Sequence, residues 1–156
     1  MQLKLLLAFL ICFHYSQAQM TDTTLLIGKI EKTNLTKYSW YESNYSTYKA
    51  DQTALDKLKP FVPELKVMVV MGTWCGDSHE LVPAFFTIAE KIGLPDSKIE
   101  MIAVDRKKNC PLPDISSLNI EYVPTFFVFY EDKLMGKIVE TPAKTLEADL
   151  LDLLMK

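Results

Sequence analysis

The sequence predicts an α/β fold in which one mixed β-sheet is flanked by helices. Two apolar runs, 67–71 and 99–104, have the composition of strands that are buried on both faces. A helix-spaced apolar pattern lies between them and ends at Gly93. The strand–helix–strand order that results, followed by a hairpin and a last helix, is typical of a mixed sheet with helices on both faces. The expected later elements are a short helix at 115–118, hairpin strands at 126–130 and 134–139, and a leucine-rich helix at 143–155.

Length and composition indicate one globular domain with a sizeable core. The chain has 156 residues, of which 49% are hydrophobic, and its net charge is −3. This charge gives no electrostatic reason to expect a nucleic acid or an acidic lipid as partner. The two histidines and three cysteines do not have metal-ligand spacing, so we expect neither a metal nor a cofactor.

The N-terminus has the pattern of a secretory signal peptide over residues 1–18. Lys4 precedes an uncharged apolar run at 5–13, and Ser16-Gln17-Ala18 forms a small-x-small cleavage site before Gln19. Nine apolar residues are too few to span a bilayer, so no stable membrane span is expected. The pattern predicts an exported protein, periplasmic or secreted; the alternative is an ordinary buried strand or helix. Removal of the signal would also remove Cys12, and Cys75 and Cys110 would remain in an oxidising compartment.

Residues 19–60 are expected to form an N-terminal extension, and 61–156 the main domain. The extension has one predicted helix at 50–59, and its apolar triplet 25–27 either forms an edge strand or stays unpaired. Five aromatic residues fall within 38–48. They either form a surface for a ligand or partner, because such rings favour interfaces, or pack the extension onto the domain.

A short motif stands where the first buried run gives way to the helical pattern. It reads Trp74-Cys75-Gly76-Asp77-Ser78 and resembles the thioredoxin active-site sequence Trp-Cys-Gly-Pro-Cys. Pro83 and the segment Val123-Pro124-Thr125 also resemble the kink proline and the cis-proline signature of that family. The resemblance covers residues 66–154. It implies a thioredoxin-like fold and a cis Val123–Pro124 bond that faces the cysteine.

Cys75 is the candidate nucleophile, because backbone N–H groups and the positive dipole end at a helix N-terminus stabilise a thiolate. His79 would add to this effect if protonated, whereas the carboxylate of Asp77 opposes it, so the residues leave the net effect open. The alternative for Cys75 is an inert buried thiol. We expect His79 to face solvent on the helix rather than to act as a base.

Ser78 occupies the position of the second family cysteine and cannot resolve a mixed disulfide. Its hydroxyl can donate a hydrogen bond to the sulfur of Cys75. Cys110 is the remaining candidate for a resolving thiol, because the loop after the second core strand lies at the same sheet edge as Cys75. The alternative is a loop thiol without a partner, since a bridge requires Cα atoms within about 7 Å.

The predicted function is thiol–disulfide chemistry on proteins through the single nucleophile Cys75, assisted by Ser78. The expected partners are protein thiols or disulfides, together with a small-molecule thiol or a reductase. Whether the chain turns over as an enzyme is left open. The alternatives are a non-catalytic binding module for extended polypeptides and a structural role in which the aromatic extension docks a partner. The residues expected to shape the substrate groove are Trp74, Gly76, Asp77, Val123 and Pro124.

Overall fold

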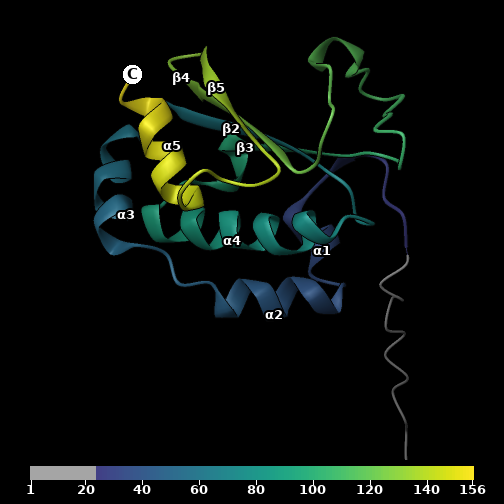
Figure 1. Cartoon of the computed structure of the whole chain (residues 1–156), viewed down its shortest axis with the longest axis horizontal. Helices are drawn as coiled ribbons and strands as arrows, with labels where there is room; N and C mark the ends of the chain where they lie inside the picture. Colours follow the sequence, from purple (N-terminus) through teal and green to yellow (C-terminus); the bar gives the residue numbers. More distant parts are fainter. Residues whose placement is uncertain (1–23) are drawn as a thin grey trace, which may run out of the picture.

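The computed structural model describes residues 24–156, so the predicted signal peptide, Cys12 and the cleavage site before Gln19 lie outside the described residues. Five strands and five α-helices make up this part of the chain (Figure 1). The strands are β1 (Gly28–Ile30), β2 (Leu65–Met71), β3 (Ile99–Ala103), β4 (Thr125–Tyr130) and β5 (Lys133–Val139). The α-helices are α1 (Lys32–Leu35), α2 (Ser39–Thr47), α3 (Gln52–Leu58), α4 (Gly76–Ile92) and α5 (Leu146–Leu154). Three 3-10 turns are η1 (Lys59–Phe61), η2 (Asp96–Lys98) and η3 (Ser116–Leu118).

The strands form one mixed sheet in the order β1-β3-β2-β4-β5. Only β2 and β3 run parallel, and every other neighbouring pair is antiparallel. The central strand β2 is the apolar run that the sequence predicts to be buried on both faces: Val69 and Val70 are both inaccessible, although they point to opposite faces. The predicted α/β fold with a mixed sheet is confirmed.

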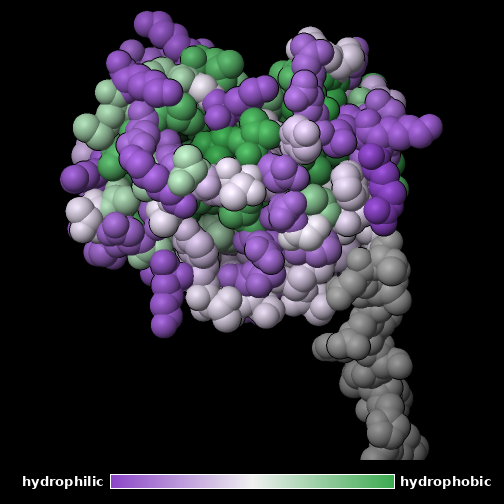
Figure 2. Space-filling view, in the orientation of Figure 1, coloured by the Kyte–Doolittle hydropathy of each residue, from purple (hydrophilic) through white to green (hydrophobic). Residues whose placement is uncertain are grey.

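The two faces of the sheet are covered differently. One face packs on α4 and α5, whose apolar residues form the main core with Val67, Val69 and Phe126. The other face has a smaller cluster around Val70 and Ile102, covered by residues of the 105–124 loop. Figure 2 shows apolar residues gathered between this loop and the β4–β5 hairpin.

The expectation of helices on both faces is therefore wrong for the second face. The predicted short helix at 115–118 is the single 3-10 turn η3, and no α-helix lies between β3 and β4. Pro111 and Pro113 lack the backbone N–H that a helix needs, and Asn119 ends η3 in the left-handed conformation, with φ 49°.

The N-terminal extension is built into the domain. Its edge strand is β1, which follows the apolar triplet 25–27 instead of coinciding with it, and pairs antiparallel with β3. Figure 1 shows α2 running alongside α4. The predicted helix at 50–59 is present as α3, and the structure adds α1 and α2 before it. In α2, Trp40 and Tyr41 are buried against the core, so the aromatic cluster packs the extension onto the domain.

The C-terminal helix is fastened to the extension by a buried carboxylate. Glu147 is 1% exposed, and its oxygens accept hydrogen bonds from the Tyr48 hydroxyl at 2.6 Å and the Asp51 N–H at 2.7 Å. Thr145 caps the first turn of the same helix by accepting from the Ala148 N–H. Within residues 24–156, no helix is both long enough and apolar enough to cross a membrane.

Candidate active site

Cys75 lies in the turn that leads from β2 into α4, where it is the N-cap residue of the helix. Its N–H donates to the Gly72 carbonyl at 3.0 Å, which closes the turn, and its side chain is half-buried. On the other side the thiol packs against the second-face cluster, beside Trp74. The sulfur of Cys75 is therefore partly accessible beside the first turn of α4, and it makes no capping hydrogen bond to that turn.

The sulfur of Cys75 faces the loop that precedes β4. The Val123–Pro124 peptide bond is cis, and the Val123 carbonyl oxygen lies 3.1 Å from Sγ. A carbonyl oxygen only accepts, so this contact belongs to the protonated thiol, which donates its S–H. The Asp77 carboxylate is 4.0 Å from the same sulfur, and Asp77 and Gly76 are exposed at the start of α4.

Ser78 is hydrogen-bonded to the end of β2, and among the described residues its hydroxyl makes no hydrogen bond to the Cys75 sulfur. The Ser78 side chain is fully buried, and its oxygen accepts the Gly72 N–H at 3.3 Å. Helical side chains point back towards the N-terminus, so Ser78 reaches the end of β2, where a backbone donor needs a partner. Among the described residues, the hydrogen-bond partners of Cys75 Sγ are Val123 and Asp77.

Trp74 joins the carboxyl ends of β2 and β3. Its indole N–H donates to the Val104 carbonyl at 2.9 Å, and the Arg106 guanidinium lies over the ring, 5.4 Å from its centroid. Gly72 is required for this packing, because a Cβ there would come within 2.6 Å of the indole. Trp74 therefore forms a fixed wall beside the thiol.

His79 does not face solvent as expected. Its Nε2 lies 2.9 Å from the Thr73 carbonyl oxygen, and its ring stacks on Trp40 with centroids 4.3 Å apart and an interplanar angle of 12°. The Asn44 amide also donates to the His79 carbonyl at 2.9 Å. Both Trp40 and Asn44 come from α2, so the extension reaches the first turns of the Cys75 helix.

Thr73 is a second contact between the extension and the turn. Its hydroxyl oxygen accepts the Leu26 N–H at 3.2 Å and donates to the Thr24 carbonyl at 3.1 Å. Nothing in the thioredoxin-like motif indicates that Thr73, Trp40 or Asn44 contacts the Cys75 turn. The density of aromatic residues at 38–48 was the one sequence signal that pointed to this part of the chain.

Cys110 and Cys75 are both free thiols. Cys110 is 5% exposed and belongs to the second-face cluster against which Cys75 packs, so the two cysteines share a neighbourhood without a bridge. The structure thus matches the alternative of a shielded loop thiol. Asp105 lies at the start of this loop, and its carboxylate accepts the N–H groups of Lys107 and Asn109 at 2.8 Å each.

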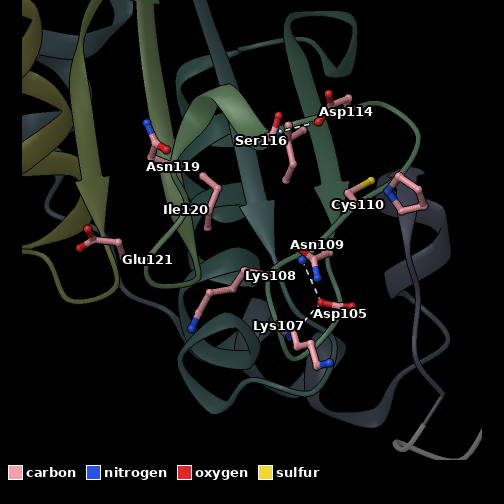
Figure 3. Close-up of a pocket in the computed structure, with 12 residues that line it drawn as sticks. Asp105, Lys107, Lys108, Asn109, Cys110, Asp114, Ser116, Asn119, Ile120 and Glu121 are labelled. Atoms are coloured by element: carbon pink, nitrogen blue, oxygen red, sulfur yellow. Dashed lines mark hydrogen bonds between the residues drawn. The ribbon is translucent and has the colours of Figure 1, made fainter.

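The same loop encloses a pocket of about 810 Å³. Figure 3 shows it between the limb that carries Asp105 and Cys110 and the limb that carries Asn119 and Glu121. Neither Cys75 nor Pro124 is among its lining residues, so the thiol lies in a turn outside this pocket. Across residues 24–156, no group of three or more metal-ligating side chains is placed to hold a metal ion.

One family model matches the chain, and several solved structures are similar to it. A family model described as thioredoxin matches residues 28–151, whereas no curated protein matches the chain. Among solved structures, a Pseudomonas aeruginosa protein of unknown function is 16% identical, with a TM-score of 0.49 over 74% of this chain and 80% of its own. The thioredoxin Deadhead of Drosophila melanogaster is 18% identical, with a TM-score of 0.39 over 64% and 87%. Oxidised thioredoxin O2 of Arabidopsis thaliana is 20% identical, with a TM-score of 0.40 over 66% and 82%. Because the family model spans most of the sequence, from β1 into α5, the chain belongs to the thioredoxin family.

Proposed function

We propose that this protein performs thiol–disulfide exchange on protein substrates with Cys75 as its only nucleophile. One observation carries the proposal: a half-buried thiol caps α4 beside the Val123–Pro124 loop, while the residue three positions later is a buried serine. Cys75 attacks as its thiolate, the nucleophilic form of a cysteine. Ser78 has no thiol with which to expel a bound substrate.

The proposed reaction has two steps. In the first, the Cys75 thiolate attacks a substrate disulfide R–S–S–R′, forms a Cys75–S–S–R mixed disulfide and releases R′S⁻. In the second, an external thiolate R″S⁻ attacks the substrate sulfur, forms R–S–S–R″ and releases Cys75 as a thiolate. The external thiol belongs to a protein, a small-molecule thiol or a reductase. No net oxidation occurs, because one disulfide is consumed and one is formed.

The residues around Cys75 have separate roles in this proposal. Trp74 and the Val123–Pro124 loop form the walls against which an extended substrate lies, and exposed Gly76 and Asp77 leave the sulfur open to solvent on the helix side. The S–H donates to Val123 at rest, so deprotonation has to release this hydrogen bond before attack.

Cys110 is a poor second thiol in the arrangement seen, because it is almost fully buried beneath its own loop. A bridge to Cys75 would require this loop to move. We expect Cys110→Ser to leave formation of the Cys75 mixed disulfide unchanged. A longer lifetime of the mixed disulfide in that variant would identify Cys110 as the resolving thiol instead.

We also propose that the protein works outside the cytosol, on the basis of Lys4, the apolar run at 5–13 and the small residues before Gln19. An oxidising compartment would supply the disulfides that Cys75 attacks. N-terminal sequencing of protein recovered from the exporting cell tests this directly. Material that still begins at Met1 contradicts it.

A binding module for extended polypeptides is the second candidate, and the buried Ser78 favours it because a module needs no resolving thiol. The deciding experiment incubates the protein with a disulfide-containing protein and identifies trapped adducts by mass spectrometry. Exchange predicts adducts on Cys75 that a small thiol releases, and their loss in Cys75→Ser. Polypeptide binding that persists in Cys75→Ser, without any adduct in the parent protein, identifies the binding module.

A further inference from the structure

The turn that presents Cys75 is held from the outside by the N-terminal extension. Thr73 is the residue through which this happens: the 24–26 segment pairs with its hydroxyl, and His79 reaches its carbonyl oxygen. That carbonyl belongs to the peptide bond that joins Thr73 to Trp74, the residue before Cys75. The orientation of the Thr73 peptide therefore contributes to the orientation of the thiol.

His79 is suited to hold this peptide. Because a carbonyl oxygen only accepts, Nε2 carries a proton and donates it to Thr73. The His79 N–H donates to the Cys75 carbonyl at 3.1 Å, so this one residue contacts both ends of the Thr73–Cys75 segment. A side chain in the second turn of α4 reaches back to Thr73 because helical side chains point towards the N-terminus.

The imidazole is in turn fixed by α2. Trp40 covers one face of the ring in a near-parallel stack, and Asn44 donates to the His79 carbonyl. Trp40 is 9% exposed, so the stack excludes solvent from that face. The stack holds the imidazole ring and the Asn44 amide holds the backbone of His79, so the side chain has little freedom to turn away from Thr73.

We propose that His79 is a positioning residue for Cys75 and that Trp40 of the extension keeps it in place. The inference rests on the proposed chemistry of Cys75 and adds a role for the extension in that chemistry. The aromatic segment at 38–48 then acts on the reactivity of the thiol, in addition to packing the core. His79 acts through the Thr73 peptide and not by taking a proton from the substrate.

The test measures alkylation of Cys75 by iodoacetamide between pH 5 and pH 10, with peptide mass spectrometry to read this cysteine alone. The plot of alkylation rate against pH gives two quantities: the pH at which the rate is half its maximum, and the limiting rate at high pH. We expect His79→Leu to lower the limiting rate about fivefold, the loss expected from one net hydrogen bond. His79→Gln retains a donor for Thr73 and should stay within twofold of the parent rate.

Thr87→Val is the matched control. The Thr87 hydroxyl donates to the Tyr45 carbonyl at 2.9 Å, so the variant weakens the same α2–α4 contact two turns away from His79. It should lower stability without changing the alkylation of Cys75. Equal effects of Thr87→Val and His79→Leu on the limiting rate would overturn the proposal, as would a failure of His79→Gln to restore it.

If His79→Leu does not fold, Trp40→Leu and Trp40→Phe test the same proposal from the other side of the Trp40–His79 stack. Loss of the stack in Trp40→Leu should slow alkylation, and Trp40→Phe should recover most of the rate; an unchanged rate in Trp40→Leu overturns the proposal. Alkylation needs a reactive thiol but no disulfide substrate. If no protein disulfide ever forms an adduct, the proposed function fails, while the dependence of Cys75 on His79 is still measured.

Discussion

Replacing Glu147 should lower the stability of the whole domain, because its carboxylate fastens α5 to the segment between α2 and α3. Glu147→Ala removes the acceptor of two hydrogen bonds, from the Tyr48 hydroxyl and the Asp51 N–H. Each buried donor left without a partner costs about 1–3 kcal/mol. Tyr48 is half-buried and Asp51 lies at the surface, so water can reach both donors in part and the low end applies to each. We expect a loss of about 2 kcal/mol in the free energy of unfolding.

Glu147→Gln removes the negative charge and keeps the size and shape of the side chain, so it measures the contribution of the charge to stability. The amide keeps an oxygen for the Asp51 N–H and turns its NH₂ towards the Tyr48 hydroxyl, which can accept as well as donate. Both hydrogen bonds survive without the negative charge, and charge-assisted bonds are roughly twice as strong as neutral ones. The expected loss is therefore about 1 kcal/mol.

Urea unfolding followed by far-UV circular dichroism measures these differences. Glu80→Ala serves as the control, because Glu80 is an exposed glutamate on α4 and its replacement should change stability by no more than about 0.5 kcal/mol. A Glu147→Ala variant as stable as Glu80→Ala would refute the reasoning. So would a Tyr48→Phe change whose effect simply adds to that of Glu147→Gln, since contacting residues should couple in a double-mutant cycle.

Three further predictions follow from the site and the extension. Ser78→Cys should supply a resolving thiol, so that adducts on Cys75 disappear faster and disulfide reduction rises in a turbidity assay of insulin reduction; unchanged adduct lifetimes contradict it. Gly72→Ala should cost about 1–3 kcal/mol and shift the tryptophan fluorescence, because the new methyl group meets the indole, whereas Gly76→Ala, with open space around it, should do neither. Burial, followed by the hydrogen bond to Glu147 and its charge, raises the pKa of Tyr48 well above its ordinary 10.0. Tyr48 of the unfolded chain therefore ionises first, and the stability of the fold decreases as pH rises past about 10. Tyr48→Phe should flatten that fall in urea midpoints measured from pH 9 to pH 11.

The core strands β2 and β3, the Cys75 helix and the β4–β5 hairpin were predictable because each has a local signature; the edge strand β1 was not. The run 67–71 is continuously apolar, and the 3.6-residue spacing of α4 begins directly after the motif. Helix α2 was not predictable in the same way. Its nine residues are polar or aromatic, and only Trp40 and Tyr41 are buried, so no continuous apolar face marks it.

The site was predictable in its residues but not in its contacts. Cys75 and Val123 come together as the motifs implied, since both belong to turns next to the central strands. The Ser78 side chain points to the Gly72 N–H at the end of β2, which has to find an acceptor. The His79 side chain stacks on Trp40, a ring 39 positions earlier in the sequence. Both contacts depend on how the elements pack against one another, and no local sequence pattern reveals that packing.

Because only a loop covers the second face of the sheet, the reaction rate of Cys110 measures how often that loop opens. The 105–124 loop shields Cys110 without any strand or α-helix of its own, so it can lift from the sheet while the strand pairing and the main core stay intact. Such sub-global opening has a smaller free energy than complete unfolding. The rate at which a thiol reagent reaches Cys110, divided by its rate with a fully accessible thiol, gives the opening equilibrium directly. Backbone amides of β2 and β4 should exchange far more slowly, because they are released only when the sheet itself comes apart.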